Sequence, residues 1–226
     1  DPLWSRGLGD VYKRQTKWSQ RMTEPIRVVI AEDEAIIRLD LKESLEAEGY
    51  AVIGETGRGD EAIDLVRMLE PDLVILDIKM PGMNGIDAAK VISDEGLAAV
   101  ILLSAFSQQD LIKEASNAGV LAYLVKPFQR SDLVPSIELA LGRFEEISGL
   151  KQEAVMLRES LETRKLVDRA KGLLIDNYGL KESDAYRYLQ KKAMEDRTTM
   201  KAVAEDILAD TSRVDSGSFE KVDKKL

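Results

Sequence analysis

The stretch Leu73–Asp94, LVILDIKMPGMNGIDAAKVISD, gives the strongest indication of the fold that this chain adopts. Its first residues, 73–76, are uniformly apolar and indicate a buried strand, and the Pro, Gly and Asn residues that follow indicate a loop through Gly85. Residues 86–94 then carry helical spacing. A strand that is buried along its whole length is typical of a parallel sheet covered on both faces.

The same alternation of strand and helix extends to both sides of this stretch. Further strand-like runs occupy residues 26–31, 51–55, 100–103 and 121–125, and helical patterns occupy residues 35–48, 60–69 and 109–118 and continue from residue 132. This series predicts an α/β domain over residues 25–143 with a flavodoxin-like, doubly wound, five-stranded parallel sheet. Ligands of such a sheet bind just beyond the carboxyl ends of its strands.

The composition limits the chemistry of the chain. Its 226 residues include no Cys and no His. Disulfides, thiolate nucleophiles, His-containing triads and metal sites built from either residue are therefore excluded, and a bound metal must have oxygen ligands, as Mg²⁺, Ca²⁺ or Mn²⁺ does. No apolar run approaches the roughly 18 residues that a membrane-spanning helix needs, so we expect a cytoplasmic protein with no membrane partner.

Charged and hydroxyl side chains gather at the carboxyl ends of the predicted strands. Glu32 and Asp33 follow the first strand, Asp77 follows the third, Ser104 ends the fourth, and Lys126 follows the fifth. Carboxylates this close repel one another unless a cation lies among them. In a chain without His and Cys, Mg²⁺ is the natural cation, and one carboxylate can then act as a nucleophile toward phosphorus.

These residues, with the segments LDIKMPGMNG at 76–85, SA at 104–105 and YLVKPF at 123–128, resemble the receiver domain of two-component response regulators. The resemblance implies that Asp77 is the phospho-acceptor and that a sensor histidine kinase is the partner that donates the phosphoryl group. It also implies Mg²⁺ as cofactor and a role for each residue of the motif. The implied metal ligands are Glu32, Asp33, Asp77 and the backbone carbonyl of Lys79, and the implied phosphoryl-contacting and switch residues are Ser104, Lys126 and Tyr123.

Each of these residues has an ordinary structural explanation when it is taken alone. An acidic residue at a strand end often caps a helix, an Asp before a Pro/Gly loop is often a turn residue, and an aromatic residue in a strand usually packs in a core. Their joint occurrence favours the receiver site. We expect no independent enzyme, only acceptance of a phosphoryl group from a kinase and slow hydrolysis of the acyl phosphate.

Residues 144–162 are predicted to form a coiled-coil connector helix. Apolar residues recur there at alternating spacings of three and four among charged residues, namely Ile147, Leu150, Ala154, Leu157 and Leu161. The alternative is a single amphipathic helix that packs on its own domain.

A small three-helix domain is predicted over residues 163–210, with Thr198 or Thr199 capping the third helix. Residues 25–144 hold 11 basic and 21 acidic residues, a net charge of −10, whereas residues 163–201 hold 10 basic and 6 acidic residues, a net charge of +4. A basic island on an acidic chain is compatible with binding to a phosphate backbone. The alternative is that these Lys and Arg residues only keep the helix surfaces solvated and bind no nucleic acid. Tyr186 and Tyr188 are candidates for stacking on RNA bases.

The run RKLVDRAKGLL at 164–174, with AYRYL at 185–189, AM at 193–194 and VA at 203–204, is similar to the ANTAR domain, an RNA-binding antitermination module. A receiver, a coiled-coil connector and ANTAR in this order resemble antitermination response regulators of actinobacterial type. The resemblance implies that dimers, formed on activation, bind paired stem-loops of nascent mRNA. The residues predicted to contact RNA are Lys171, Arg187, Lys191 and Arg197.

Two other functions stay open at this point. The helical module could bind a protein in a phosphorelay or adaptor, or it could bind DNA as a helix-turn-helix domain.

At the chain ends, Met22 is the expected natural start, residues 1–24 are expected to be a non-native or disordered extension, and residues 211–226 a disordered tail.

Overall fold

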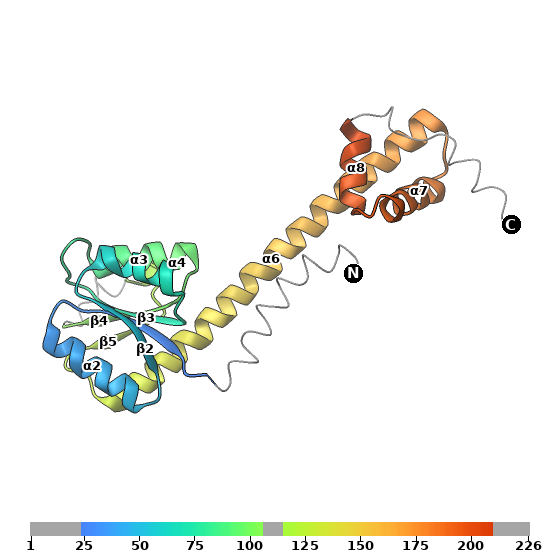
Figure 1. Ribbon diagram of the computed structural model, residues 1–226. Helices are drawn as coiled ribbons and strands as arrows, with labels where there is room; N and C mark the ends of the chain where they lie inside the picture. Colours follow the sequence, from blue (N-terminus) through green and yellow to red (C-terminus); the bar gives the residue numbers. More distant parts are fainter. Residues whose placement is uncertain (1–23, 106–114, 210–226) are drawn as a thin grey trace. The chain divides into compact units, whose positions relative to one another are not determined.

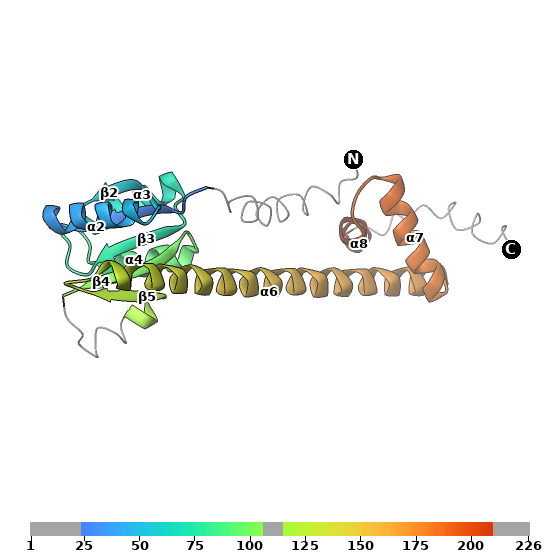
Figure 2. The ribbon, with the colours of Figure 1, turned by 90° about the horizontal axis from the view of Figure 1, so that it is seen from below.

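The structure is a computed structural model that describes residues 24–105 and 115–209 (Figures 1 and 2). The predictions for residues 1–23 and for the C-terminal tail lie outside these residues. The chain forms two compact units, and the boundary between them falls between Lys151 and Gln152. In the described part of the chain, no helix is long and apolar enough to cross a membrane.

The first unit contains one five-stranded sheet. Its strands are β1 Arg27–Ala31, β2 Ala51–Thr56, β3 Leu73–Asp77, β4 Ala99–Ser104 and β5 Ala122–Val125. All neighbouring pairs are parallel, and the strand order is β2-β1-β3-β4-β5. This order confirms the predicted flavodoxin-like fold and places the reversal of strand order between β1 and β3.

Helices cover both faces of this sheet, as Figure 1 shows. They are α2 Ala35–Ala47, α3 Gly59–Leu69, α4 Gly85–Glu95 and the first part of α6 Arg130–Tyr178. Val74 and Leu76 of β3 pack with α3 and α4, while Leu73 and Ile75 pack in a second core with α2 and α6. Successive strand residues point to opposite faces, so burial on both faces explains why the β3 sequence is continuously apolar.

The helices of the first unit begin and end close to the predicted positions. α4 begins after Asn84, whose side-chain oxygen accepts a hydrogen bond of 2.8 Å from the Asp87 backbone N–H, and this cap fixes the end of the loop that follows β3. The helix predicted over residues 109–118 lies partly outside the described residues, and its last turn, residues 115–117, is helical.

α6 differs from the prediction in one respect. The sequence suggested a connector followed by a separate helix from residue 163, but a single helix of 49 residues runs from Arg130 to Tyr178. Gly149 and Gly172 lie inside it, and each costs only about 1 kcal/mol relative to Ala, which a helix with this many backbone hydrogen bonds tolerates.

The second unit has its own small core. The last part of α6 packs with α7 Glu182–Glu195 and α8 Met200–Ala209 through Ala170, Leu174, Leu189 and Ala204, which are fully buried. The Ala202 backbone N–H donates a 3.2 Å hydrogen bond to Thr199 Oγ1, which confirms Thr199 as the cap of α8. Tyr188 is buried in this core, so the suggestion that it stacks on RNA bases is wrong.

Candidate functional site

The carboxyl ends of β1, β3 and β5 bring two carboxylates and an ammonium group together. Glu32, directly after β1, is fully buried, and Asp77, the last residue of β3, is 6% exposed. Lys126 Nζ lies 2.6 Å from Glu32 Oε2 and 2.7 Å from Asp77 Oδ1. The parallel sheet therefore assembles a buried acid–base–acid cluster from segments that are far apart in the sequence.

Asp33 adds a third carboxylate at the mouth of this cluster. Ligand oxygens of Glu32, Asp33 and Asp77 all lie within 4.8 Å of one another, and Asp33 is exposed to solvent. Three carboxylates around one point that solvent can reach fit a hard divalent cation such as Mg²⁺. The Lys79 backbone N–H donates a 3.0 Å hydrogen bond to Asp77 Oδ2, which orients the carboxylate.

The electrostatics of the cluster follow from its burial. Burial raises the pKa of the Glu32 carboxyl, and the hydrogen bond from Lys126 opposes that rise without cancelling it. Burial lowers the pKa of Lys126, but its hydrogen bonds to Asp77 and Glu32 outweigh that effect, so its pKa lies above the ordinary value. Lys126 is therefore charged at neutral pH, and its ammonium group lies between the carboxylates of Glu32 and Asp77.

Backbone contacts hold the acidic pair that follows β1. The Glu34 backbone N–H donates to Glu32 Oε1 at 3.2 Å, and the Arg38 guanidinium donates to the Glu32 carbonyl oxygen. Sequence reasoning missed Arg38, because a single arginine one turn into a helix gives no signal of what it touches. Its role is structural support of the segment that carries two of the carboxylates.

The loop after Asp77 depends on two glycines, Gly85, at which the sequence placed the end of the loop, and Gly59, which sequence reasoning missed. A Cβ atom on Gly85 would lie 1.9 Å from the Asp77 carbonyl oxygen, and one on Gly59 would lie 2.1 Å from the Met83 carbonyl oxygen. Gly85 N–H donates to the Ile78 carbonyl at 2.9 Å. Only glycine permits these approaches, so the loop closes tightly on the carboxylate that it follows.

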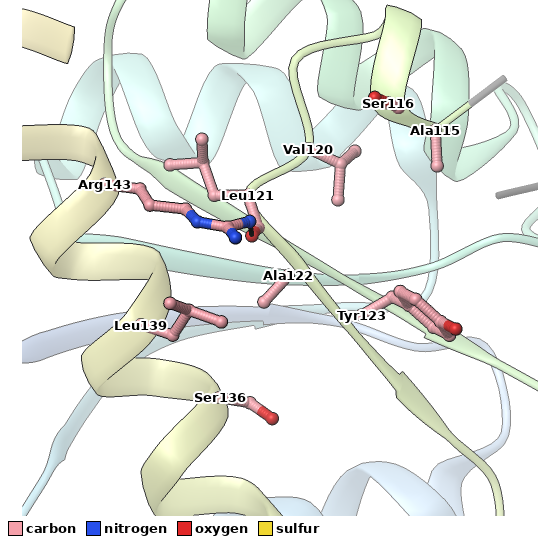
Figure 3. A pocket seen from close by; sticks show the side chains of 9 residues that line it. All are labelled: Ala115, Ser116, Val120, Leu121, Ala122, Tyr123, Ser136, Leu139 and Arg143. Carbon is pink, nitrogen blue, oxygen red and sulfur yellow. Dashed lines mark hydrogen bonds between the residues drawn. The ribbon is translucent and has the colours of Figure 1, made fainter. Parts of the chain in front are cut away.

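Ser104 and Tyr123 lie on the two strands nearest Lys126. Ser104 ends β4 and is buried, and its carbonyl accepts a 2.7 Å hydrogen bond from the Lys126 backbone N–H. Tyr123 on β5 is 42% exposed and so is not a core aromatic. It lines a hollow of about 320 Å³ between β5 and α6, shown in Figure 3, together with Leu139 and Arg143.

The four predicted RNA-contacting residues differ in their surroundings. Lys171 is mostly buried, and its Nζ lies 2.9 Å from Asp168 Oδ1 and 3.0 Å from Glu182 Oε1, which ties α6 to the start of α7. Lys191 Nζ lies 3.7 Å from Glu195 Oε1 on the same helix. Arg187 and Arg197 are exposed, and neither forms an ion pair with any residue that the structure describes.

An exposed line of side chains runs along α7 and past its end. Tyr186, Gln190 and Met194 are four residues apart and all exposed, Met194 by 70% and Tyr186 by 47%. Residues at this spacing lie on one helix face, whereas Arg187 follows Tyr186 on the same helix and Arg197 lies beyond the end of the helix. An exposed aromatic ring and an exposed amide on one face of α7, with exposed guanidinium groups on and just after that helix, suit contact with nucleic acid bases and phosphates.

Two family profiles match separate parts of the chain. Residues 28–138 match the response regulator receiver domain, and residues 156–208 match the ANTAR domain. The first match contains the carboxylate cluster, and the second contains α7 and all but the last residue of α8.

Individual proteins match over the same regions. The chain is 56% identical over 184 residues to the transcriptional regulatory protein PdtaR of Mycobacterium tuberculosis, an alignment that covers 81% of this chain and 90% of that protein. It is 43% identical over 112 residues to the chemotaxis protein CheY of Thermotoga maritima, covering 49% of this chain and 93% of that one. Among solved structures, the receiver domain of the putative response regulator NarL of M. tuberculosis aligns with a TM-score of 0.51 and 28% identity, over 53% of this chain and 98% of that one.

We predict that Gly85→Ala lowers the free energy of unfolding of the first unit by about 1–3 kcal/mol, because the new methyl group collides with the Asp77 carbonyl oxygen. Gly142→Ala is the matched control. Its Cβ meets nothing within 4 Å inside α6, so it should raise stability by up to about 1 kcal/mol. Hydrogen exchange of the β3 backbone amides measures the change in the free energy of unfolding for both variants. Equal stability of the two variants would show that the loop after Asp77 is not tightly closed.

Proposed function

The chain belongs to the response regulators in which a receiver domain is followed by an ANTAR domain, and on this basis we propose that phosphorylation of Asp77 controls its binding to structured RNA. The observation that carries the proposal is the buried Asp77 carboxylate, held 2.7 Å from Lys126 Nζ beside two further carboxylates. The binding of RNA is supported by the ANTAR match and by the exposed face of α7.

The phosphoryl donor that we propose is a phosphohistidine on a sensor histidine kinase. A carboxylate oxygen of Asp77 attacks its phosphorus, a phosphorus–oxygen bond forms, and the phosphorus–nitrogen bond breaks. The departing imidazole keeps the electron pair and takes up a proton. The hydrogen bond from Lys79 N–H to Asp77 Oδ2 holds the carboxylate in place for this attack. We infer no independent enzyme activity beyond slow hydrolysis of the acyl phosphate.

Glu32, Asp33 and Asp77 are the side chains proposed to hold Mg²⁺, together with the backbone carbonyl of Lys79. A bound Mg²⁺ supplies positive charge that offsets the charge of the phosphoryl oxygens. Lys126 would offset the same charge through its ammonium group, which already contacts Asp77.

Phosphorylation adds a charge of about −1.5 to −2 at Asp77 and three strong hydrogen-bond acceptors. We propose that the Ser104 hydroxyl and the Lys126 ammonium group bind these acceptors. β4 and β5 are hydrogen-bonded partners, with Ser104 beside Val125, so a shift at Ser104 reaches the strand that carries Tyr123. Tyr123 is then the switch residue, since its half-exposed ring can exchange between solvent and the hollow beside it.

The exposed face of α7 is the proposed RNA surface. Arg187 and Arg197 are proposed to contact phosphates and Tyr186 to stack on a base exposed in an RNA loop. Lys171 and Lys191 would first have to exchange their carboxylate partners for phosphate. We propose paired stem-loops of nascent mRNA as the target, antitermination of transcription as the result, a homodimer as the active form, and the cytoplasm as the location.

Asp77→Asn should abolish labelling by a small phosphodonor such as acetyl phosphate in the presence of Mg²⁺, because the amide is not a nucleophile toward phosphorus. The wild-type chain should gain the mass of one phosphoryl group in intact-mass spectrometry and lose this labelling when Mg²⁺ is chelated. Asp64→Asn, an exposed carboxylate of α3, is the control and should label normally. Labelling of the Asp77→Asn chain at the wild-type rate would contradict the assignment.

Tyr186→Ala should weaken binding to an RNA with two adjacent stem-loops by about 5- to 100-fold. Tyr186→Phe should retain the wild-type affinity, because Phe keeps the aromatic ring that stacks on the base. Arg197→Gln should reduce the slope of log affinity against log salt concentration by about one. Lys90→Gln, an exposed change on α4, is the control. Lack of RNA binding at low salt, or equal binding of duplex DNA, would overturn the RNA assignment.

A further inference from the structure

We propose that Arg38 of α2 is a positioning residue for the Mg²⁺ site, because its guanidinium group holds the peptide bond between Glu32 and Asp33 in the orientation that this site needs. The carbonyl oxygen of that peptide belongs to Glu32, and Arg38 Nη1 donates a hydrogen bond to it. The inference rests on the Mg²⁺ site of the proposed function and adds to it a residue that is not itself a metal ligand.

The two carboxylates that follow β1 come from adjacent residues. Adjacent side chains of an extended segment point in opposite directions, as they do along a strand. Ligand oxygens of Glu32 and Asp33 nevertheless lie within 4.8 Å of each other and of a ligand oxygen of Asp77, and the chain bends at Asp33. The orientation of the peptide between the two residues therefore decides whether both carboxylates reach the same ion.

Backbone hydrogen bonds hold part of this bend. The Glu32 backbone N–H donates to the Thr56 carbonyl oxygen at 3.0 Å, and the Glu34 backbone N–H donates to Glu32 Oε1 at 3.2 Å. These two bonds fix the strand end and the Glu32 side chain, but neither involves the Glu32 carbonyl oxygen. Arg38 bonds that oxygen and so acts on the part of the peptide that the other two bonds do not hold.

Arg38 is itself anchored to the sheet. Its Nε lies 4.0 Å from Glu55 Oε2 on β2, and Glu55 pairs with Ile30 of β1. A Cβ atom on Gly57 would lie 3.5 Å from Arg38 Nη1, so the loop after β2 packs against the guanidinium group. Because the guanidinium group is planar and rigid, a contact at one nitrogen also limits the direction in which the other nitrogens donate.

The charge of Arg38 and its hydrogen bond should affect Mg²⁺ binding in opposite directions. A guanidinium cation near the cluster repels Mg²⁺, although the Glu55 carboxylate offsets part of that charge. Holding the two carboxylates in place strengthens Mg²⁺ binding, because less conformational freedom is lost when the ion binds. The sign of the change on removing Arg38 therefore distinguishes the two effects, and we expect the loss of orientation to dominate.

Arg38→Met tests the proposal, because it removes the charge and the hydrogen-bond donors and keeps most of the apolar stem. In the full chain without a phosphodonor, it should raise the Mg²⁺ dissociation constant about tenfold, the lower end of the usual effect of losing a group that orients metal ligands. The measurement is a titration with MgCl₂ followed by the backbone amide NMR signals of Asp33 and Asp77. Unchanged or tighter Mg²⁺ binding would overturn the proposal.

Lys42→Met is the matched control. Lys42 lies one turn further along α2, and its Nζ lies 2.5 Å from Oε1 of the same Glu55 carboxylate. The substitution therefore removes an equal charge from the same group of ions and leaves the Arg38 hydrogen bond to Glu32 intact. It should keep the Mg²⁺ dissociation constant within about twofold of the wild-type value. An increase as large as that of Arg38→Met would show that charge or loosening of α2 is the cause, against the proposal.

The Mg²⁺ dependence of phosphorylation separates positioning from a general loss of structure. For Arg38→Met, the Mg²⁺ concentration that gives half the maximal rate of labelling by acetyl phosphate should rise about tenfold. The rate at saturating Mg²⁺ should stay within about twofold of wild type, because Lys126 keeps its contact with Asp77. A lower rate at every Mg²⁺ concentration, with the half-maximal concentration unchanged, would contradict a positioning role.

The same measurements distinguish failure of this inference from failure of the proposed function. If the wild-type chain binds Mg²⁺ but acetyl phosphate does not label it, the proposed function fails, and the Mg²⁺ affinities of Arg38→Met and Lys42→Met still decide the role of Arg38. If the wild-type chain is labelled and Arg38→Met binds Mg²⁺ as tightly as wild type does, the positioning role is wrong and the proposed function stands.

Discussion

The contact of the largely buried Lys126 ammonium group with two buried carboxylates is the constraint that holds the first unit together at its functional edge. Lys126 Nζ touches Glu32 and Asp77, which follow or end strands at opposite sides of the switch point in the sheet. Burying an unpaired carboxylate costs several kcal/mol, so the sheet, the acidic segment after β1 and the residue after β5 must all be in place together. With Asp33 added, the cluster still carries an excess of negative charge, which a cation can reduce.

This excess of negative charge also makes the cluster sensitive to any further charge added at Asp77. In the proposed function, a phosphoryl group adds further negative charge to Asp77, and Lys126 and the hydroxyl of Ser104 are the groups proposed to bind it. Ser104 ends β4 and Lys126 follows β5, so the proposed response would act on the edge of the sheet where Tyr123 is exposed. Elsewhere in the described part of the chain, the exposed face of α7 that carries Tyr186, Gln190 and Met194 is a feature that a change in association could use.

Much of this arrangement could be predicted because it follows from local patterns. Continuous apolar runs mark strands that are buried on both faces, and the residues after them must meet at one edge. Arg38 and Gly59 escaped prediction, as did the close approach of Gly85 to Asp77, because these roles depend on contacts with backbone atoms of other segments. Tyr186 and Tyr188 could not be told apart by composition, although only one faces the core. The ion pair of Lys171 with Glu182 arises from the turn between two helices, which no periodicity describes.

The proposed regulation requires that charge at Asp77 and binding of RNA are coupled. The decisive quantity is the dissociation constant of a labelled two-stem-loop RNA, measured for the full chain before and after phosphorylation by acetyl phosphate and Mg²⁺. We expect at least about fivefold tighter binding by the phosphorylated chain, the lower end of usual allosteric coupling. Equal affinity of the two forms, with mass spectrometry showing Asp77 to be fully phosphorylated, would refute the coupling.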